Sequence, residues 1–142
     1  MIVIGRRDKI DLPDLDINNI EVKIDTGAYG SALHCHHVEV INKNGLDFLT
    51  FKVLDPTHPE YEDKVISVKN FKDKIVKSSS GESEHRYTFK TNVTIFNETS
   101  LVEFSLTNRD KMKYPILLGR KFLNKRFLVD IHQKDLSFQL IK

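Results

Sequence analysis

The sequence has one cysteine, Cys35, and no tryptophan among its 142 residues. A single cysteine excludes an internal disulfide and is compatible with a reducing compartment. No apolar run approaches the roughly 20 residues of a transmembrane helix, so we expect no membrane partner. The apolar start, Met1 to Gly5, is followed by Arg6 and Arg7 and is too short for the core of a signal peptide. These absences predict a cytoplasmic protein.

The charge balance gives no sign of a nucleic-acid partner. The net charge is +2, and charged residues make up 30% of the chain. A nucleic-acid-binding domain would be expected to have a clustered basic face. The aromatic residues, none of them tryptophan, stand at strand-like positions, which does not suggest base stacking. The 39% of hydrophobic residues and the length predict one globular domain over residues 1–142.

Many short segments alternate apolar and polar residues, as half-buried strands do. We expect strands at 2–5, 20–25, 31–41, 46–54, 65–68, 71–76, 87–95, 102–106, 116–118 and 127–131. Hairpin turns are expected at 42–45 and 97–100, and a proline-containing loop at 55–60. Residues 119–126 have the spacing of one to two helical turns, and Leu136 to Ile141 closes the chain. The pattern predicts an all-β, barrel-like domain with one short C-terminal helix.

The strand expected at 20–25 ends in Asp25-Thr26-Gly27. An acid at a strand end, followed by a small hydroxyl residue and a glycine, can hold a carboxylate in a fixed pose. Gly27 lets the backbone turn without a β-carbon penalty, and Thr26 can donate and accept hydrogen bonds behind the acid. The same three residue types are ordinary in turns. The function of the triplet therefore depends on its context.

A second feature lies far downstream, where the apolar run 116–118 meets Gly119-Arg120 and a short helical pattern. Together with the Asp-Thr-Gly triplet, this segment resembles the retropepsin-like aspartic peptidases. In that family the triplet carries the catalytic aspartate, and an apolar-apolar-Gly-Arg segment packs beside it. The resemblance implies a closed, retropepsin-like β-barrel. The positions concerned are Asp25, Thr26 and Gly27 for catalysis, and Gly119 and Arg120 as structural neighbours.

One branch of that family matches more closely. The matching segments are Ile4-Gly-Arg-Arg7, Lys23 to His34, Lys77-Ser-Ser-Ser-Gly-Glu82 and Leu117-Leu-Gly-Arg120. They are similar, in the same order, to the bacterial family known as ATP-dependent zinc proteases. That family is often encoded beside ATP-grasp glutamate ligases, which implies such a ligase or its product as a partner. One departure is Tyr29-Gly30 after Ala28, where this branch often has a longer polar or basic residue.

Aspartic peptidases hydrolyse an amide with two carboxylates that share one proton. The ionised carboxylate activates a water, and the protonated one polarises the carbonyl. This sequence contains one Asp-Thr-Gly. A chain with one copy can complete the pair only with a second copy, so the hypothesis requires a C2 homodimer. We therefore predict an aspartic endopeptidase that acts on a peptide or protein substrate without a cofactor.

A peptidase of this type needs a lid that covers the substrate. Residues 78–84 join two expected strands and contain Gly81, so we expect the lid there, with a surface loop of no consequence as the alternative. The predicted substrate-binding residues are Ala28, Ser79, Ser80, Gly81 and Arg86. A basic subsite for Glu-rich peptides is expected from Arg6, Arg7, Arg86 and Arg120. An alternative for Arg120 is an ion pair with Asp8 or Asp110.

The name of the resembled branch also suggests a zinc site. On a strand, His34 and His36 would point to the same face and supply two ligands, whereas a catalytic zinc usually has three protein ligands. His58, His85 and His132 are expected on loops, and the sequence has neither His-Glu-x-x-His nor a phosphate-binding loop. We favour a site without metal, with Cys35 as a small buried hydrophobe. The alternatives are a zinc-dependent hydrolase using His34/His36 and a non-catalytic peptide- or partner-binding module.

Overall fold

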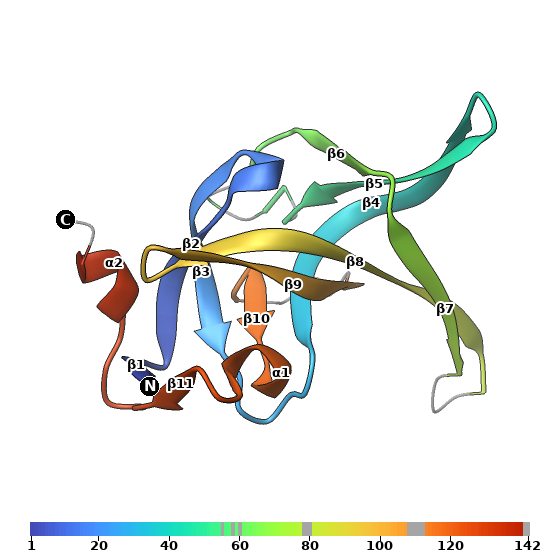
Figure 1. Ribbon diagram of the computed structural model, residues 1–142. Helices are drawn as coiled ribbons and strands as arrows, with labels where there is room; N and C mark the ends of the chain where they lie inside the picture. The colour runs from blue at the N-terminus through green and yellow to red at the C-terminus, as the bar shows by residue number, and fades with distance from the viewer. Residues whose placement is uncertain (55, 58, 60, 78–80, 108–112, 141–142) are drawn as a thin grey trace.

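The computed structural model describes residues 1–54, 56–57, 59, 61–77, 81–107 and 113–140, without the side chains of 76 and 77. The chain is mostly strand (Figure 1). The strands are β1 (Ile2–Ile4), β2 (Arg7–Leu12), β3 (Ile17–Ile24), β4 (Ser31–Lys43), β5 (Leu46–Val53), β6 (Val65–Val68), β7 (Phe71–Lys77), β8 (Ser83–Ile95), β9 (Glu98–Thr107), β10 (Ile116–Leu118) and β11 (Phe127–Val129). The helices are the 3-10 helix η1 (Pro13–Leu15), α1 (Arg120–Leu123) and α2 (Leu136–Leu140). The all-β prediction is confirmed.

Six strands close into a barrel in the order β10, β3, β2, β8, β9, β4 and back to β10. Strand β10 closes the ring because it pairs parallel with β3 and antiparallel with β4. Apolar residues that alternate along β2, β3, β8 and β9 fill the interior, as the expected period predicts. Among them, Ile10, Val22, Val93 and Phe104 have at most 1% of their surface exposed. The predicted closed barrel is confirmed.

Two hairpins extend from the barrel (Figure 1). The β4–β5 hairpin turns at Asn44 and Gly45, which both have positive φ, as a tight hairpin turn requires. The second hairpin joins β7 to β8, with a register running from Phe71 opposite Phe89 to Lys77 opposite Ser83. We call the part of this hairpin formed by residues 71–77 and 83–87 the arm. The lid was predicted for residues 78–84, of which 78–80 lie outside the described residues.

Two elements differ from the sequence prediction. Strand β2 was not expected, because a charged residue, Asp8, occupies an inward position and is only 1% exposed. Residues 136–140 form a second α-helix where one short helix was expected in the chain. The backbone N–H groups of Ser137 and Phe138 donate to the Asp8 carboxylate at 2.9 and 3.1 Å. This contact joins residues more than a hundred positions apart, so no local pattern could indicate it.

No helix in the part of the chain that the structure describes is long and apolar enough to cross a membrane.

Candidate active site

Asp25 stands at the end of β3, next to the point where β10 also ends. Its backbone N–H donates to the Leu118 carbonyl at 2.9 Å, which extends the β3–β10 pairing by one residue. The Gly27 N–H donates to the Asp25 Oδ1 at 3.0 Å, and the Ala28 N–H donates to the Asp25 carbonyl at 3.3 Å. The Asp25 side chain is partly exposed. The turn therefore holds one carboxylate oxygen in place and leaves the group within reach of solvent.

Gly119 packs directly against the loop that follows Asp25. A β-carbon at position 119 would lie 2.2 Å from the Gly30 carbonyl oxygen and 2.7 Å from that of Tyr29. The Gly119 N–H also donates to the Ser31 Oγ at 3.1 Å in the protein interior. The approach is too close for any side chain, so glycine is required at this junction.

Arg120 also binds the loop that follows Asp25. Its Nη1 donates to the Thr26 carbonyl at 3.0 Å, and its backbone N–H donates to the Ala28 carbonyl at 2.9 Å. The guanidinium carbon lies 6.0 Å from the centre of the Tyr29 ring. The structure thus gives Arg120 a partner other than Asp8, whose carboxylate binds backbone N–H groups of its own. Asp110, the other alternative, lies outside the described residues.

An open hollow of about 690 Å³ lies beside the Asp-Thr-Gly turn. Its lining includes Thr26, Tyr29, Arg120, Met1 and Leu128. Three of these side chains are apolar and exposed: Met1 by 80%, Tyr29 by 64% and Leu128 by 57%. The surface next to the carboxylate therefore offers apolar area that a second macromolecule would bury.

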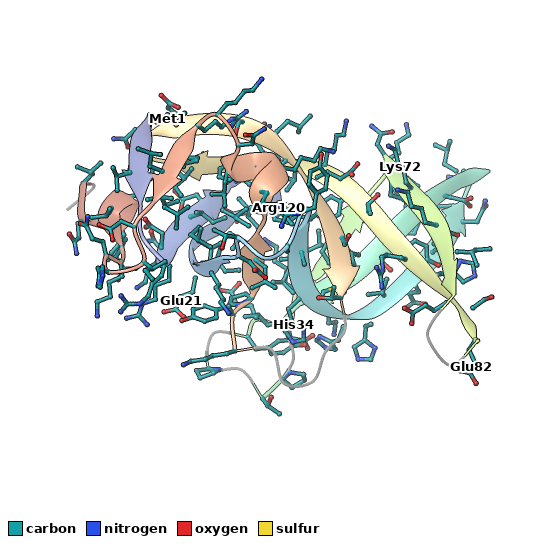
Figure 2. All side chains as sticks on the ribbon, turned by 90° about the horizontal axis from the view of Figure 1, so that it is seen from below. Met1, Glu21, His34, Lys72, Glu82 and Arg120 are labelled. Carbon is teal, nitrogen blue, oxygen red and sulfur yellow. The ribbon has the colours of Figure 1, made fainter. Side chains whose placement is uncertain are left out.

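The predicted substrate residues lie in different places. Ala28 belongs to the turn itself, whereas Gly81, with φ +85°, and Arg86 lie on the hairpin that carries the arm. Ser79 and Ser80 lie outside the described residues. Figure 2 shows Arg120 near the middle of the molecule and Glu82 at the end of the arm. No hydrogen bond or ion pair among the described residues joins the arm to Asp25.

The four arginines of the expected basic subsite have separate surroundings. Arg6 Nη1 donates to the carbonyls of residues 131 and 132, both at 3.3 Å. Arg86 forms an ion pair with Glu84 at 3.4 Å, and Arg120 binds the Thr26 carbonyl. Arg7 is opposite Lys23 in the β2–β3 pairing. No contact among the described residues gathers these arginines into one subsite.

The histidine segment lies on β4. His34 is fully buried, and its backbone N–H donates to the Pro115 carbonyl at 2.7 Å, just before β10. The His36 ring has a partner at each nitrogen: the Leu54 carbonyl at Nδ1 and the Tyr61 hydroxyl, 3.4 Å away, at Nε2. No group of three or more His, Cys, Asp or Glu side chains is placed to hold a metal within the described residues. His58 lies outside them.

Cys35 is fully buried beside these histidines, as expected of a small hydrophobe. Burial raises the pKa of its thiol to about 12. The thiolate is the reactive and metal-binding form of cysteine. This side chain is therefore suited to packing and not to chemistry.

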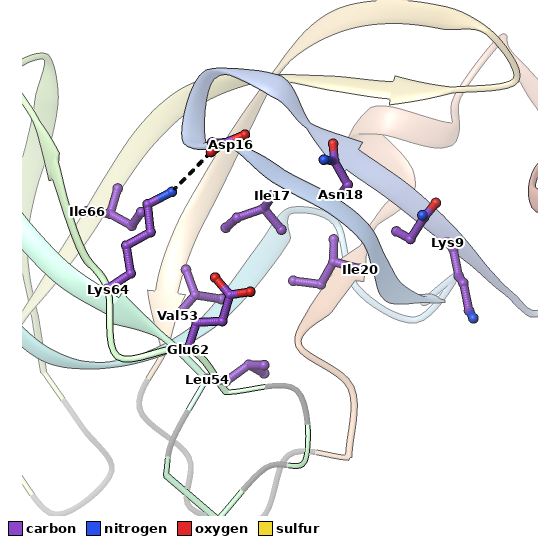
Figure 3. A pocket seen from close by; sticks show the side chains of 11 residues that line it. Lys9, Asp16, Ile17, Asn18, Ile20, Val53, Leu54, Glu62, Lys64 and Ile66 are labelled. Carbon is purple, nitrogen blue, oxygen red and sulfur yellow. Dashed lines mark ion pairs between the residues drawn. The ribbon is translucent and has the colours of Figure 1, made fainter.

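A separate pocket of about 450 Å³ lies by the first half of β3, away from Asp25 at the end of that strand (Figure 3). Its lining includes Ile20, Val53 and Ile66. Lys64 lies on its rim, where its Nζ donates to the Leu15 carbonyl at 3.1 Å and lies 3.8 Å from the Asp16 carboxylate. No motif in the sequence indicates this pocket, because its walls combine Lys9 with residues from 16–20, 53–54 and 62–66.

Comparisons with known proteins match the chain almost throughout. The model of a family described as RimB-like, retropepsin-like aspartic endopeptidase RimB, matches residues 3–138. A protein from Desulfotalea psychrophila and one from Shewanella pealeana, both named probable alpha-L-glutamate ligase, are 30% and 31% identical to it. Each match covers 90% of this chain but 28% of the relative. The chain thus spans little more than a quarter of the length of those relatives.

A solved structure shows the same fold. The crystal structure of a protein of unknown function from Legionella pneumophila aligns with a TM-score of 0.74 and 26% sequence identity. The alignment covers 96% of this chain and 98% of that one. The family match extends over both the Asp-Thr-Gly turn and the Gly-Arg junction that packs on it. This protein belongs to the RimB-like family of retropepsin-like aspartic endopeptidases.

Proposed function

We propose that this protein is an aspartic endopeptidase of the cytoplasm and acts as a homodimer in which each subunit supplies Asp25. The observation that carries the proposal is the geometry of Asp25. Its carboxylate is partly exposed at a strand end, one of its oxygens accepts the Gly27 N–H at 3.0 Å, and Gly119-Arg120 closes on the turn behind it. A carboxylate held in this way can bind a water molecule and take its proton.

The proposed reaction needs Asp25 of both subunits. The ionised carboxylate takes a proton from a water molecule, whose oxygen attacks the carbonyl carbon of the scissile amide. The protonated carboxyl of the partner subunit donates its hydrogen to the carbonyl oxygen. To expel the amine, one carboxyl of the pair gives its proton to the leaving nitrogen, and a hydroxyl group of the tetrahedral intermediate returns a proton to the other carboxylate. The pair then again shares one proton. Because the two groups share a proton, their two titration steps belong to the pair and not to one residue.

The surface around Asp25 supports self-association. Thr26 is exposed in the single chain, and the exposed apolar side chains of Met1, Tyr29 and Leu128 lie around the hollow beside it. A C2 interface uses the same patch on both subunits. A patch that includes the Asp-Thr-Gly turn would bring the two carboxylates together and bury these apolar groups. Thr26 would then support the carboxylate of the partner subunit.

We further propose acidic, Glu-rich peptides as substrates. The support is the similarity to proteins named probable alpha-L-glutamate ligase, whose product is a chemically matched substrate. A ligase of that kind, or its product, is thus the partner that we propose. Arg86 on the arm is the cation that we assign to these substrates.

The test combines molar mass and cleavage. Light scattering across a range of concentrations should give the mass of two chains, and a library of acidic and neutral peptides should be cleaved. Asp25→Asn should keep the dimer and lose nearly all turnover, whereas Asp47→Asn, on the exposed end of the β4–β5 hairpin, should keep both. Turnover by Asp25→Asn would exclude the mechanism.

A non-catalytic binding module is the second candidate. The relatives favour it, because in them the matching segment makes up 28% of a longer chain with its own ligase name. A binding module would hold an acidic peptide equally well with asparagine at position 25. Undiminished peptide binding by Asp25→Asn, together with no cleavage by the unmodified protein, would identify this function.

A further inference from the structure

We infer that a row of basic side chains, running along one face of the arm and the barrel toward α1, forms a docking surface for the acidic segment of a peptide substrate. This inference rests on the proposed function, because it places a second contact for the same substrate outside the Asp25 turn. We call the row the basic strip. It consists of Lys72, Lys74, Arg86, Lys90 and Lys121.

The strand register places the first four of these residues on one face. In β8, Arg86, Thr88 and Lys90 are spaced two apart, so their side chains point the same way. In β7, Lys74 is directly opposite Arg86, and Lys72 is opposite Thr88. The opposite face of the arm carries Phe71 and Tyr87, whose rings pack edge to face. The arm therefore has one aromatic face and one basic face.

The proximity of Lys74 and Arg86 does not stabilise the single chain. Like charges directly opposite each other on neighbouring strands are destabilising. Arg86 has one acidic neighbour, Glu84, at 3.4 Å, and no ion pair within the described residues involves Lys74. An anion that lies between the two cations would relieve their repulsion. The arrangement thus favours binding of a negatively charged group.

Glu103 connects this face of the arm to the site. Its carboxylate lies 3.8 Å from the Lys72 Nζ and 4.0 Å from the Lys121 Nζ. Lys121 is the second residue of α1, and its backbone N–H donates to the Tyr29 carbonyl at 2.8 Å, in the loop that follows Asp25. The basic strip therefore begins beside the Asp-Thr-Gly loop and continues outward on the arm.

The spacing of the strip suits an extended polypeptide. Alternate residues of a strand are about 6.6 Å apart, because each residue adds about 3.3 Å. An extended peptide has the same repeat, so every second acidic side chain would meet a cation of the strip. A run of glutamates fits this pattern without a defined sequence. The substrate would be retained by its acidic segment while a bond elsewhere along it reaches Asp25.

The position of the aromatic side chains favours an acidic peptide over nucleic acid. Single-stranded nucleic acids bind where aromatic side chains stack on the bases within a basic groove. The aromatic side chains of the arm, Phe71 and Tyr87, lie on the face opposite to Lys74 and Arg86.

The test measures binding without cleavage. Protein carrying Asp25→Asn is titrated with a fluorescent decaglutamate, with decaglutamine as the neutral probe. In this background, Lys74→Gln with Arg86→Gln is compared with Lys43→Gln and Lys69→Gln, which remove the same charge from exposed positions elsewhere. Loss of one exposed ion pair weakens binding about 2- to 5-fold, so the arm pair should weaken decaglutamate binding about 4- to 25-fold. The control pair should change it less than 2-fold.

Equal weakening by both pairs, or none by the arm pair, would overturn the docking surface. So would a single-stranded RNA of ten nucleotides that displaces decaglutamate more strongly than unlabelled decaglutamate does. The proposed peptidase function is tested separately by cleavage of neutral peptides with unmodified Asp25. In that assay the arm variants should keep kcat and raise KM only for acidic substrates. Cleavage without this selective rise in KM would exclude the docking surface but would still support the proposed peptidase function.

Discussion

Gly119 and Gly30 face each other so closely that a β-carbon at position 119 would lie 2.2 Å from the Gly30 carbonyl oxygen. The contact is between two backbones, so neither partner can rotate away. It fixes the distance between the loop after Asp25 and the start of α1. The first prediction follows from this contact.

Gly119→Ala should destabilise the protein by about 1–3 kcal/mol or more, because the added methyl group forces two backbone segments apart. Urea unfolding of both proteins measures the difference. Gly30→Ala is the matched control, since no atom lies within 4 Å of a β-carbon placed there. We expect the control to change stability by less than about 1 kcal/mol. Similar losses for both variants would contradict the assigned role of Gly119.

Ser31→Ala should lower the free energy of unfolding by about 1–3 kcal/mol, because it leaves the Gly119 N–H buried without its acceptor at 3.1 Å. The loss should also loosen the loop that holds Asp25. Hydrogen exchange of the Gly119 amide measures this effect directly, and exchange should become faster. Unchanged protection of that amide would show that another acceptor replaces Ser31.

Cys35 should resist alkylation in the native protein. With its pKa raised to about 12 by burial, almost none of the thiol is ionised at pH 8. Iodoacetamide should therefore react at least about a hundredfold more slowly with native protein than with protein unfolded in urea. Mass spectrometry after timed quenching gives both rates. Rapid native labelling would mean that β4 opens far more often than its burial suggests.

Asp8 should make stability depend on pH. Burial raises its pKa above the ordinary value of 3.8, although three backbone N–H groups donate to its carboxylate. A group with a raised folded pKa favours folding when protonated. Its contribution is fully present below pH 3.8 and is lost as the pH rises through the folded pKa.

The stability of the protein relative to Asp8→Asn should therefore fall as the pH rises above 3.8. Urea unfolding at several pH values gives the difference between the two proteins, in which titrations common to both cancel. NMR titration of the Asp8 carboxyl should show a midpoint above the ordinary value. A midpoint below 3.8 would mean that the donated hydrogen bonds outweigh burial.

Leu128→Glu should weaken the proposed dimer, because it places a charge in the exposed apolar surface beside Thr26. Light scattering should show a shift toward the mass of one chain, and peptide cleavage should decrease in proportion. Leu46→Glu alters a comparably exposed leucine at the end of the β4–β5 hairpin and should leave both unchanged. A dimer that tolerates Leu128→Glu would place the interface elsewhere.

Local patterns predicted most of the strands, and long-range contacts account for what they missed. The β8–β9 hairpin was recognised because Phe89, Val93 and Phe104 recur with the period of a strand, and all three are buried. Strand β2 and helix α2 were missed for one shared reason. The Asp8 carboxylate accepts hydrogen bonds from the backbone N–H groups of residues 137 and 138, which are distant in the sequence. Neither segment alone has a strong sequence pattern.

The candidate site was partly predictable in the same sense. Asp25, Gly119 and Arg120 could be named because their motifs are short and ordered, and the structure brings the two motifs into contact. The expected arginine subsite had no such support from spacing. The pairing between β7 and β8 decides which cations share a face. The register of that hairpin cannot be predicted from composition when the length of its loop is unknown. Lys72 and Lys74 were therefore overlooked.

Strand β10, which closes the barrel, is synthesised after the other five strands of the barrel. Asp25 is synthesised long before Leu118, which accepts its N–H, and Thr26 precedes Arg120, which binds it, by 94 residues. Contacts between such distant residues form slowly, because a long loop must close before they contribute. A nascent chain that has not yet reached residues 118–120 would thus contain the Asp-Thr-Gly turn without the contacts that hold it in the folded protein.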